Sequence, residues 1–194
     1  CGELTTPVTS KCGIPGTLGG APGEGLSPLE IIKFTYAYCE KMKERRPKEV
    51  GERYKVVVGK DARLSGDMVE QLVCGTLVAC GVDVVKAGFA STPTTEMAVV
   101  FAEADGGIIL TASHNPKQWN ALKLLNEKGE FLNDVEGKRV LALAEDEAYD
   151  FPQVDSIGKV VLREDFNPTH IEQVLALDMV DVDAVKERKF KVVV

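Results

Sequence analysis

The feature that most limits the fold of this chain is a regular alternation of short apolar segments and longer amphipathic segments in its first two thirds. The short segments, 54–59, 82–88 and 106–112, are rich in β-branched residues and glycine, which is typical of buried strands. The segments between them, 65–81 and 92–104, carry apolar residues every three or four positions, which predicts helices. This strand–helix–strand–helix–strand order predicts an α/β fold whose parallel sheet has right-handed crossovers.

The N-terminal part predicts a loop followed by a helix. Residues 1–26 are rich in Gly, Thr and Pro and are expected to form a loop with one short strand. A helix is expected over 27–46, with Ser27 as the N-cap, Pro28 in the first turn and Glu30 completing a capping box.

Four further elements are predicted after the third strand. Residues 120–126 have the pattern of a strand, and 133–147 that of an acidic helix with a solvated face. Residues 168–180 have helical spacing, and the chain ends on "FKVVV", which predicts a last strand. Because that strand has no turn behind it, we expect a first domain over 1–152 and, over 153–194, a linker, a bridging helix and the first strand of a truncated second domain.

Composition excludes several classes of function. The 194 residues are 44% hydrophobic with a formal net charge of -7, so no general attraction to nucleic acid or to an anionic membrane is expected. The five cysteines include no C-x-x-C pair, which argues against a disulfide framework or a zinc ribbon and favours a reducing cytoplasm. No apolar run is long enough for a membrane helix.

Polar residues gather after each of the three predicted parallel strands. The loops are "GKDARLSG", "FASTPTT" and "SHNP". Since ligands of parallel α/β sheets bind at the carboxyl ends of the strands, these loops should converge. Two cations, several hydroxyls and helix-terminal amides favour a phosphate site over an apolar pocket.

Each loop also has a structural interpretation. "GKDARLSG" can be a solvated turn before a helix, and "STPTT" a helix start with Thr92 as the cap. Ser113 can be a loop hydroxyl, His114 a hydrogen-bonded loop imidazole and Trp119 a packing residue. A serine needs a base or a metal to react. Neither G-x-S-x-G nor a Walker motif is present, which argues against a serine hydrolase of that type and against an NTPase. The chemistry that suits Ser113 is to carry a phosphoryl group while facing cations and a bound Mg²⁺.

The stretch "GGIILTASHNPKQWNALKL" closely resembles the catalytic serine loop of the α-D-phosphohexomutases, the phosphoglucomutase and phosphomannomutase family. "VGKDARLSG" resembles the family's Gly-Arg-Asp-x-Arg-x-Ser-Gly loop, with Lys60 in place of arginine, and "STPTT" resembles its Thr-Pro-Thr segment. The resemblance spans about residues 12–194.

The resemblance implies the first domain of a four-domain isomerase of carbohydrate metabolism, a three-layer α/β/α domain with a mainly parallel mixed sheet. It implies that a phosphoserine interconverts hexose 1-phosphate and 6-phosphate, of glucose or mannose, through a bisphosphate intermediate that also serves as activator. By the same resemblance Ser113 is the phosphoserine and an Mg²⁺ ligand, with the other metal ligands outside this chain. His114 and Asn115 would position the phosphoryl group, and Lys123 would act as general acid or base. The expected substrate- and phosphate-binding residues are Lys60, Asp61, Arg63 and Thr111.

Two departures from the family pattern accompany this resemblance. Pro15 stands where the family usually carries an active-site arginine, and Lys60 keeps the charge of an arginine without its planar fork. We expect the partners to be a sugar phosphate and the remaining domains of the full-length chain, and the 194 residues alone to fold but to be nearly inactive. The alternatives are a phosphoglucosamine mutase, a non-catalytic phosphate-binding protein and a lipoprotein built around Cys1.

Overall fold

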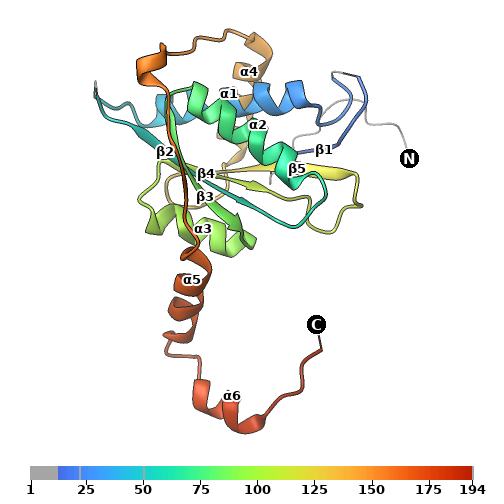
Figure 1. Cartoon of the computed structure of the whole chain (residues 1–194), viewed down its shortest axis with the longest axis vertical. Helices are drawn as coiled ribbons and strands as arrows, with labels where there is room; N and C mark the ends of the chain where they lie inside the picture. Colours follow the sequence, from blue (N-terminus) through green and yellow to red (C-terminus); the bar gives the residue numbers. More distant parts are fainter. Residues whose placement is uncertain (1–12, 22, 50, 194) are drawn as a thin grey trace.

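The computed structural model describes residues 13–21, 23–49 and 51–193. Cys1, on which the lipoprotein alternative rests, lies outside the described residues. A mixed sheet forms the middle layer, with helices on both of its faces, so the expected α/β/α architecture is confirmed (Figure 1). No helix in the described ranges has the length and hydropathy that crossing a membrane requires.

The sheet has six strands in the order β1-β5-β4-β2-β3-β6. β2 pairs in parallel with β3 and β4, and β3 pairs in parallel with β6. β5 is antiparallel to both β4 and β1, so the sheet is mainly parallel with one antiparallel side, as expected. The strands are β1 (Ile14–Thr17), β2 (Tyr54–Lys60), β3 (Val82–Phe89), β4 (Gly106–Leu110), β5 (Trp119–Leu125) and β6 (Val160–Leu162).

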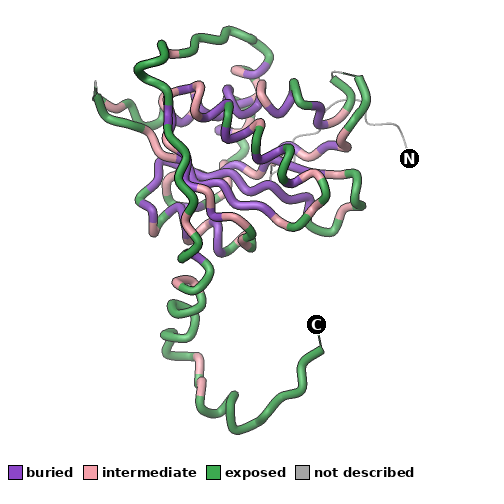
Figure 2. Tube along the Cα trace, viewed as in Figure 1, coloured by how far each residue is buried: buried purple, intermediate pink, exposed green. Residues whose placement is uncertain are grey.

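The helices divide between the two faces of the sheet. α1 (Pro28–Arg45), α2 (Gly66–Ala79) and α4 (Asp134–Asp146) pack over one face, and α3 (Thr92–Phe101) packs on the other (Figure 1). Each face has its own apolar core, and the sheet lies buried between them (Figure 2). Since α2 and α3 leave β2 and β3 toward opposite faces, the carboxyl ends of these strands lie beside a topological switch point.

The glycine pair that begins β4 allows both helical layers to close on the sheet. A Cβ at Gly106 would overlap the hydroxyl of Tyr38 in α1, and a Cβ at Gly107 would overlap Val99 in α3. Because Gly106 leaves this space free, the Tyr38 hydroxyl can donate to the Leu125 carbonyl oxygen at 2.8 Å, which ties α1 to β5.

Two helix caps differ from expectation. The Ser27 hydroxyl donates to the Glu30 carboxylate, which also accepts from the Gly23 N–H at 2.9 Å, so the expected capping box does not form. The Glu30 carboxylate satisfies the preceding loop instead of the helix start. α3 is capped by Ser91 and not by Thr92, because the Ser91 hydroxyl accepts from the Thr94 N–H at 3.2 Å.

The segment after Pro152 differs most from the sequence-based prediction. It adds β6 to the sheet edge, buries Phe166 in the second core and then leaves the domain as an exposed arm (Figure 2). A short 3-10 turn (Val154–Ser156) precedes β6, and the arm that follows β6 contains α5 (Phe166–Leu175) and α6 (Val182–Arg188). Neither β6 nor α6 was predicted, and residues 190–193 of the expected strand "FKVVV" pair with none of the described strands.

Candidate functional site

The loops that follow β2, β3 and β4 meet at one edge of the sheet. The Asp61 N–H donates to the Leu110 carbonyl oxygen at 3.2 Å, which joins the loop after β2 to the end of β4. The Ala90 N–H donates to the Lys60 carbonyl oxygen at 3.1 Å, which joins the loop after β3 to the same strand β2. The polar loops therefore converge where the topology requires.

Ser113 occupies a strained and exposed position in the loop between β4 and β5. Its φ is 54°, in the left-handed region, which costs a non-glycine residue about 1 kcal/mol. The Ser113 N–H donates to the Thr111 hydroxyl at 3.0 Å, and that hydroxyl donates to Asp61 Oδ2 at 2.6 Å. The surrounding contacts thus hold an exposed serine in a conformation that its own backbone disfavours.

Arg63 lies behind this loop, on the loop that follows β2. Its guanidinium forms an ion pair with Asp61 at 3.3 Å and donates to main-chain carbonyl oxygens of the serine loop. The accepting carbonyls belong to Ser113, Asn115, Pro116 and Trp119. Asp61, Arg63, Thr111 and Ser113 consequently form one connected hydrogen-bonded cluster.

Lys60, expected as a phosphate ligand, faces carboxylates instead. Its ammonium lies 2.6 Å from Asp67 Oδ1 and 2.8 Å from Glu70 Oε2, both on α2. Burial by itself would lower the pKa of Lys60, but the hydrogen bonds to Asp67 and Glu70 raise it above its usual value. Lys60 therefore keeps its charge, and these two carboxylates neutralise it.

A pocket of about 350 Å³ opens beside Lys60, between the end of β3 and the segment before α5. Glu70 is its most deeply buried charged residue: Oε2 also accepts from Lys86 at 2.8 Å, while Oε1 has no hydrogen-bond partner in the described part of the chain. Lysines and carboxylates both line this pocket, so its charge does not favour an anion.

Lys123, expected as the general acid or base, lies on β5 opposite Ile109 of β4. It is half-buried on the face that α3 covers, with its ammonium 5.9 Å from the centre of the Phe131 ring. Burial raises the pKa of the neighbouring Glu96 carboxyl, and the charge of Lys123 partly opposes that rise. Lys123 thus stands outside the cluster around Ser113.

Pro15 lies on the same face of the sheet as Lys123. Pro15 pairs with Ala121 across β1 and β5, and residues two apart on a strand share a face. Among the described strands β1 lies at the edge of the sheet, where proline is tolerated because one row of N–H groups faces no described strand. A cation at position 15 would therefore project beside Lys123.

His114, Asn115 and Asn120 complete the loop. The His114 ring is exposed and makes no hydrogen bond to the described residues, whereas Asn115 is held through its backbone, its N–H donating to the Ala112 carbonyl oxygen at 3.0 Å. Asn120 is fully buried and donates to the Ser65 hydroxyl at 2.9 Å. Sequence reasoning missed Asn120, although an asparagine in an otherwise apolar strand is a signal of a specific polar partner.

The described residues do not form a metal site by themselves. Nowhere in the described ranges do three His, Cys, Asp or Glu side chains gather closely enough to hold an ion. The exposed Ser113 supplies one oxygen, and the nearby carboxylate of Asp61 is already engaged by Thr111 and Arg63. An ion bound at Ser113 would need further ligands from elsewhere.

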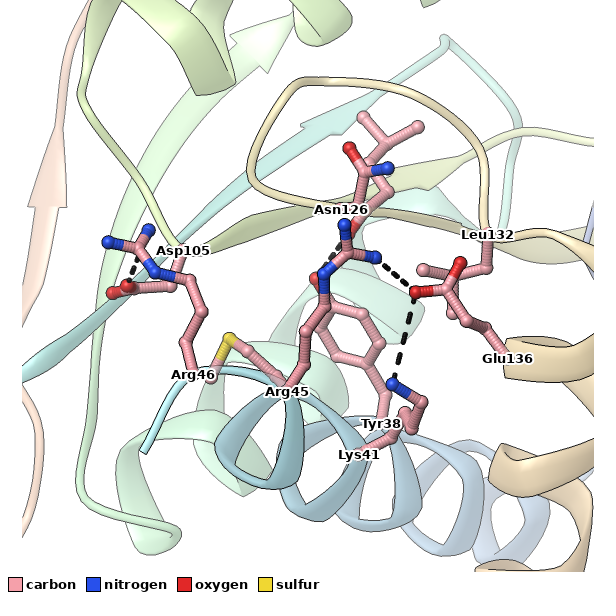
Figure 3. A pocket seen from close by; sticks show the side chains of 10 residues that line it. Tyr38, Lys41, Arg45, Arg46, Asp105, Asn126, Leu132 and Glu136 are labelled. Carbon is pink, nitrogen blue, oxygen red and sulfur yellow. Dashed lines mark hydrogen bonds and ion pairs between the residues drawn. The ribbon is translucent and has the colours of Figure 1, made fainter. Parts of the chain in front are cut away.

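A second pocket, at the opposite end of the sheet, is structural. It encloses only about 10 Å³, the space of a single water. Its cations face carboxylates, with Arg45 on Glu136 and Arg46 on Asp105 at 3.3 Å (Figure 3). Arg45 also pairs with Glu127 at 3.0 Å. These pairs tie the end of α1 to the sheet and to α4, and they neutralise the charges of Arg45 and Arg46 within the protein.

Comparisons with known proteins agree with this geometry. Residues 11–150 match the family model described as phosphoglucomutase/phosphomannomutase, alpha/beta/alpha domain I. A "phosphoglucomutase/phosphomannomutase" of Thermococcus kodakarensis is 35% identical over 92% of this chain and 38% of its own length. A "phosphoglucosamine/phosphogalactosamine mutase" of Sulfurisphaera tokodaii is 32% identical over 74% of this chain and 31% of its own length.

The fold comparison gives the same result. The "putative phosphomannomutase" of Thermus thermophilus superimposes with a TM-score of 0.72 at 26% identity, covering 91% of this chain and 37% of that structure. The chain therefore spans well under half the length of each of these relatives. With the family model covering most of its length, the chain belongs to the phosphoglucomutase/phosphomannomutase family, in which it corresponds to α/β/α domain I.

Proposed function

We propose that the full-length protein interconverts the 1-phosphate and 6-phosphate of a hexose, glucose or mannose, by phosphoryl transfer through Ser113. The observation that carries the proposal is the exposed Ser113 at the carboxyl edge of the sheet, held at a φ of 54° by contacts to Thr111 and Arg63. Positioning and charge neutralisation are the main demands of phosphoryl transfer, and a serine held in this way meets the first.

In the proposed reaction Ser113 carries the phosphoryl group. The bond from Ser113 Oγ to phosphorus breaks as the free hydroxyl of a hexose phosphate forms a new bond to phosphorus, giving a hexose bisphosphate. Lys123 accepts the proton of the attacking hydroxyl, and Ser113 Oγ leaves as an oxyanion. In the return step Ser113 Oγ forms a bond to the phosphorus at the other end of the sugar, and Lys123 gives its proton to the sugar oxygen that this phosphorus leaves. His114 and Asn115 position the phosphoryl group, and hexose bisphosphate primes the enzyme.

We further propose that Mg²⁺ neutralises charge at the phosphoserine when it is bound. Ser113 would be its ligand in this chain, and the remaining ligands would come from parts of the protein beyond these residues. The proposal for residues 153–194 is that they form a linker, a bridging helix and the entry into a second domain. This is supported by the arm that leaves the sheet after β6 and by the greater length of the relatives (Figure 1).

A phosphoglucosamine mutase is the second candidate. Its support is that relatives bearing that name have similar identity to this chain, such as the "phosphoglucosamine mutase" of Acetivibrio thermocellus, 36% identical over 75% of this chain and 33% of its own length. The two candidates share the serine loop and differ in the sugar.

The test is a substrate panel on the full-length protein with Mg²⁺ and a trace of hexose bisphosphate. Glucose, mannose and glucosamine 1-phosphates are compared for the wild type, Ser113→Ala and the control Ser156→Ala, an exposed serine in the 3-10 turn before β6. We expect turnover of one sugar by the wild type and by the control, and none by Ser113→Ala. The 194-residue chain alone is expected to show no turnover.

Two results would change the assignment. Turnover confined to glucosamine phosphate would favour the second candidate. No turnover of any sugar, together with an unmodified Ser113 by mass spectrometry, would contradict the proposal and favour a non-catalytic phosphate-binding protein.

A further inference from the structure

The guanidinium of Arg63 has no N–H group left for a ligand. A guanidinium carries five N–H donors. Nη2 donates to the carbonyl oxygens of Ser113 at 2.7 Å and Asn115 at 2.8 Å. Nη1 donates to those of Pro116 at 2.9 Å and Trp119 at 3.0 Å, and Nε donates to Asp61 at 3.3 Å. The side chain is only 11% exposed, so a substrate phosphate would have to displace contacts within the protein.

These contacts act on both sides of Ser113. Arg63 holds its carbonyl oxygen, while the Ser113 N–H is held by the Thr111 hydroxyl, which in turn donates to Asp61. Asp61 also pairs with Arg63, so the contacts to the Ser113 N–H and to the Ser113 carbonyl oxygen are connected through one carboxylate. Fixing the N–H and the carbonyl of one residue fixes both of its backbone dihedrals, which is what a strained left-handed serine requires.

We propose that Arg63 is a positioning residue for the phosphoserine loop: it sets the rate of phosphoryl transfer by holding the Ser113 backbone and does not bind the substrate phosphate. This inference rests on the proposed function and gives Arg63 a different role from the phosphate ligand that the sequence suggested. Arginine suits the role because its planar fork can reach four carbonyl oxygens at once, whereas lysine is a compact charge with three donors.

The test compares Arg63→Ala, Arg63→Lys and a control, Arg139→Ala, in the full-length protein. Arg139 also pairs with a carboxylate, Glu44, but on the surface between α4 and α1. We expect kcat to fall about 100-fold in both Arg63 variants, since a displacement of the reacting oxygen of the order of 1 Å is enough for such a loss. KM for the sugar phosphate should stay within about threefold of the wild type, and the control should match the wild type in both constants.

Added guanidinium separates positioning from general damage to the fold. In Arg63→Ala the carbonyl oxygens lose their shared donor, and a guanidinium ion from solution can occupy the same position. We expect low-millimolar guanidinium to restore part of kcat in Arg63→Ala and to leave Arg63→Lys and the control unchanged. Absence of rescue in an Arg63→Ala protein with wild-type circular dichroism would overturn the inference.

The remaining outcomes distinguish this inference from the proposed function. If the wild type turns over and Arg63→Ala keeps kcat but raises KM at least tenfold, Arg63 is a phosphate ligand and only the inference fails. If the wild type turns over no sugar, the proposed function fails. The support of the serine loop by Arg63 can then still be tested by amide hydrogen exchange of residues 111–119, which requires no enzymatic activity. Faster exchange confined to that loop in Arg63→Ala supports a positioning role for Arg63, and unchanged exchange overturns it.

Discussion

Lys60 at the end of β2 and Arg63 in the loop that follows are both cations, and they contact different groups. Lys60 lies between two carboxylates of α2, whereas Arg63 lies among the carbonyl oxygens of a loop about 50 positions later in the chain. The sequence could predict that both charges lie at the carboxyl edge of the sheet, because strand ends determine that. It could not predict their partners, because these depend on side-chain directions and on the path of a distant loop.

A prediction at this scale concerns Pro15, which shares a face with Lys123. In the full-length protein Pro15→Arg should lower KM for the sugar phosphate about tenfold, the effect of one added charge-assisted hydrogen bond to phosphate. Steady-state kinetics would measure it. Pro15→Gln is the matched control, since it restores the N–H and a polar side chain without the charge. Equal kinetic constants for the two variants would show that a cation at position 15 does not reach the substrate.

Most of the secondary-structure elements that the sequence predicted have a buried face; the exception is α5, predicted over 168–180, in which only Phe166 is buried. β2, β3, β4 and β5 and helices α1 to α4 lie within a few residues of the predicted ranges, because their apolar periodicity records contact with the cores. β6 consists of only three residues, all of them exposed, and so it has no apolar periodicity in the sequence. "FKVVV" has the composition of a strand, but for 190–193 the chain supplies no neighbouring strand to pair with.

Helix caps give a second prediction at the element scale. α4 has a capping box in which the Asn133 side chain accepts from the Val135 and Glu136 N–H groups at 3.0 Å. Asn133→Ala should lower the free energy of unfolding of the 194-residue chain by about 1 kcal/mol in urea titration. Asn133→Ser keeps an acceptor and should stay within a few tenths of a kcal/mol of the wild type. Equal losses in both variants would mean that the cap bond is not the cause.

The whole molecule combines two cores with buried groups that resist ionisation. Burial, with a smaller contribution from the charge of Glu70, raises the pKa of the Cys74 thiol from 9.0 to about 11. Burial also raises the pKa of the Tyr38 hydroxyl well above its usual range. In both groups the folded chain keeps a proton that the unfolded chain releases, so stability must fall as the pH rises above the unfolded pKa.

The alkaline dependence gives a prediction for Cys74. Between pH 9 and 11 this thiol should lower the free energy of unfolding by up to about 1.4 kcal/mol per pH unit. Urea titrations of the 194-residue chain at pH 8, 9 and 10 would measure the slope. Cys74→Ala should flatten that slope whatever its effect on stability at pH 8. A variant with the wild-type slope would contradict the assignment of this proton to Cys74.

The contacts of Arg63 also bear on which substitutions the serine loop can accept. Every oxygen that Arg63 contacts in the serine loop belongs to the main chain, so these hydrogen bonds do not depend on which side chains the loop carries. Exposed positions such as His114 and Lys117 can be exchanged by mutation without dismantling the support beneath them. The shape of the serine loop therefore depends on one arginine, and the side chains that the loop displays take no part in those contacts.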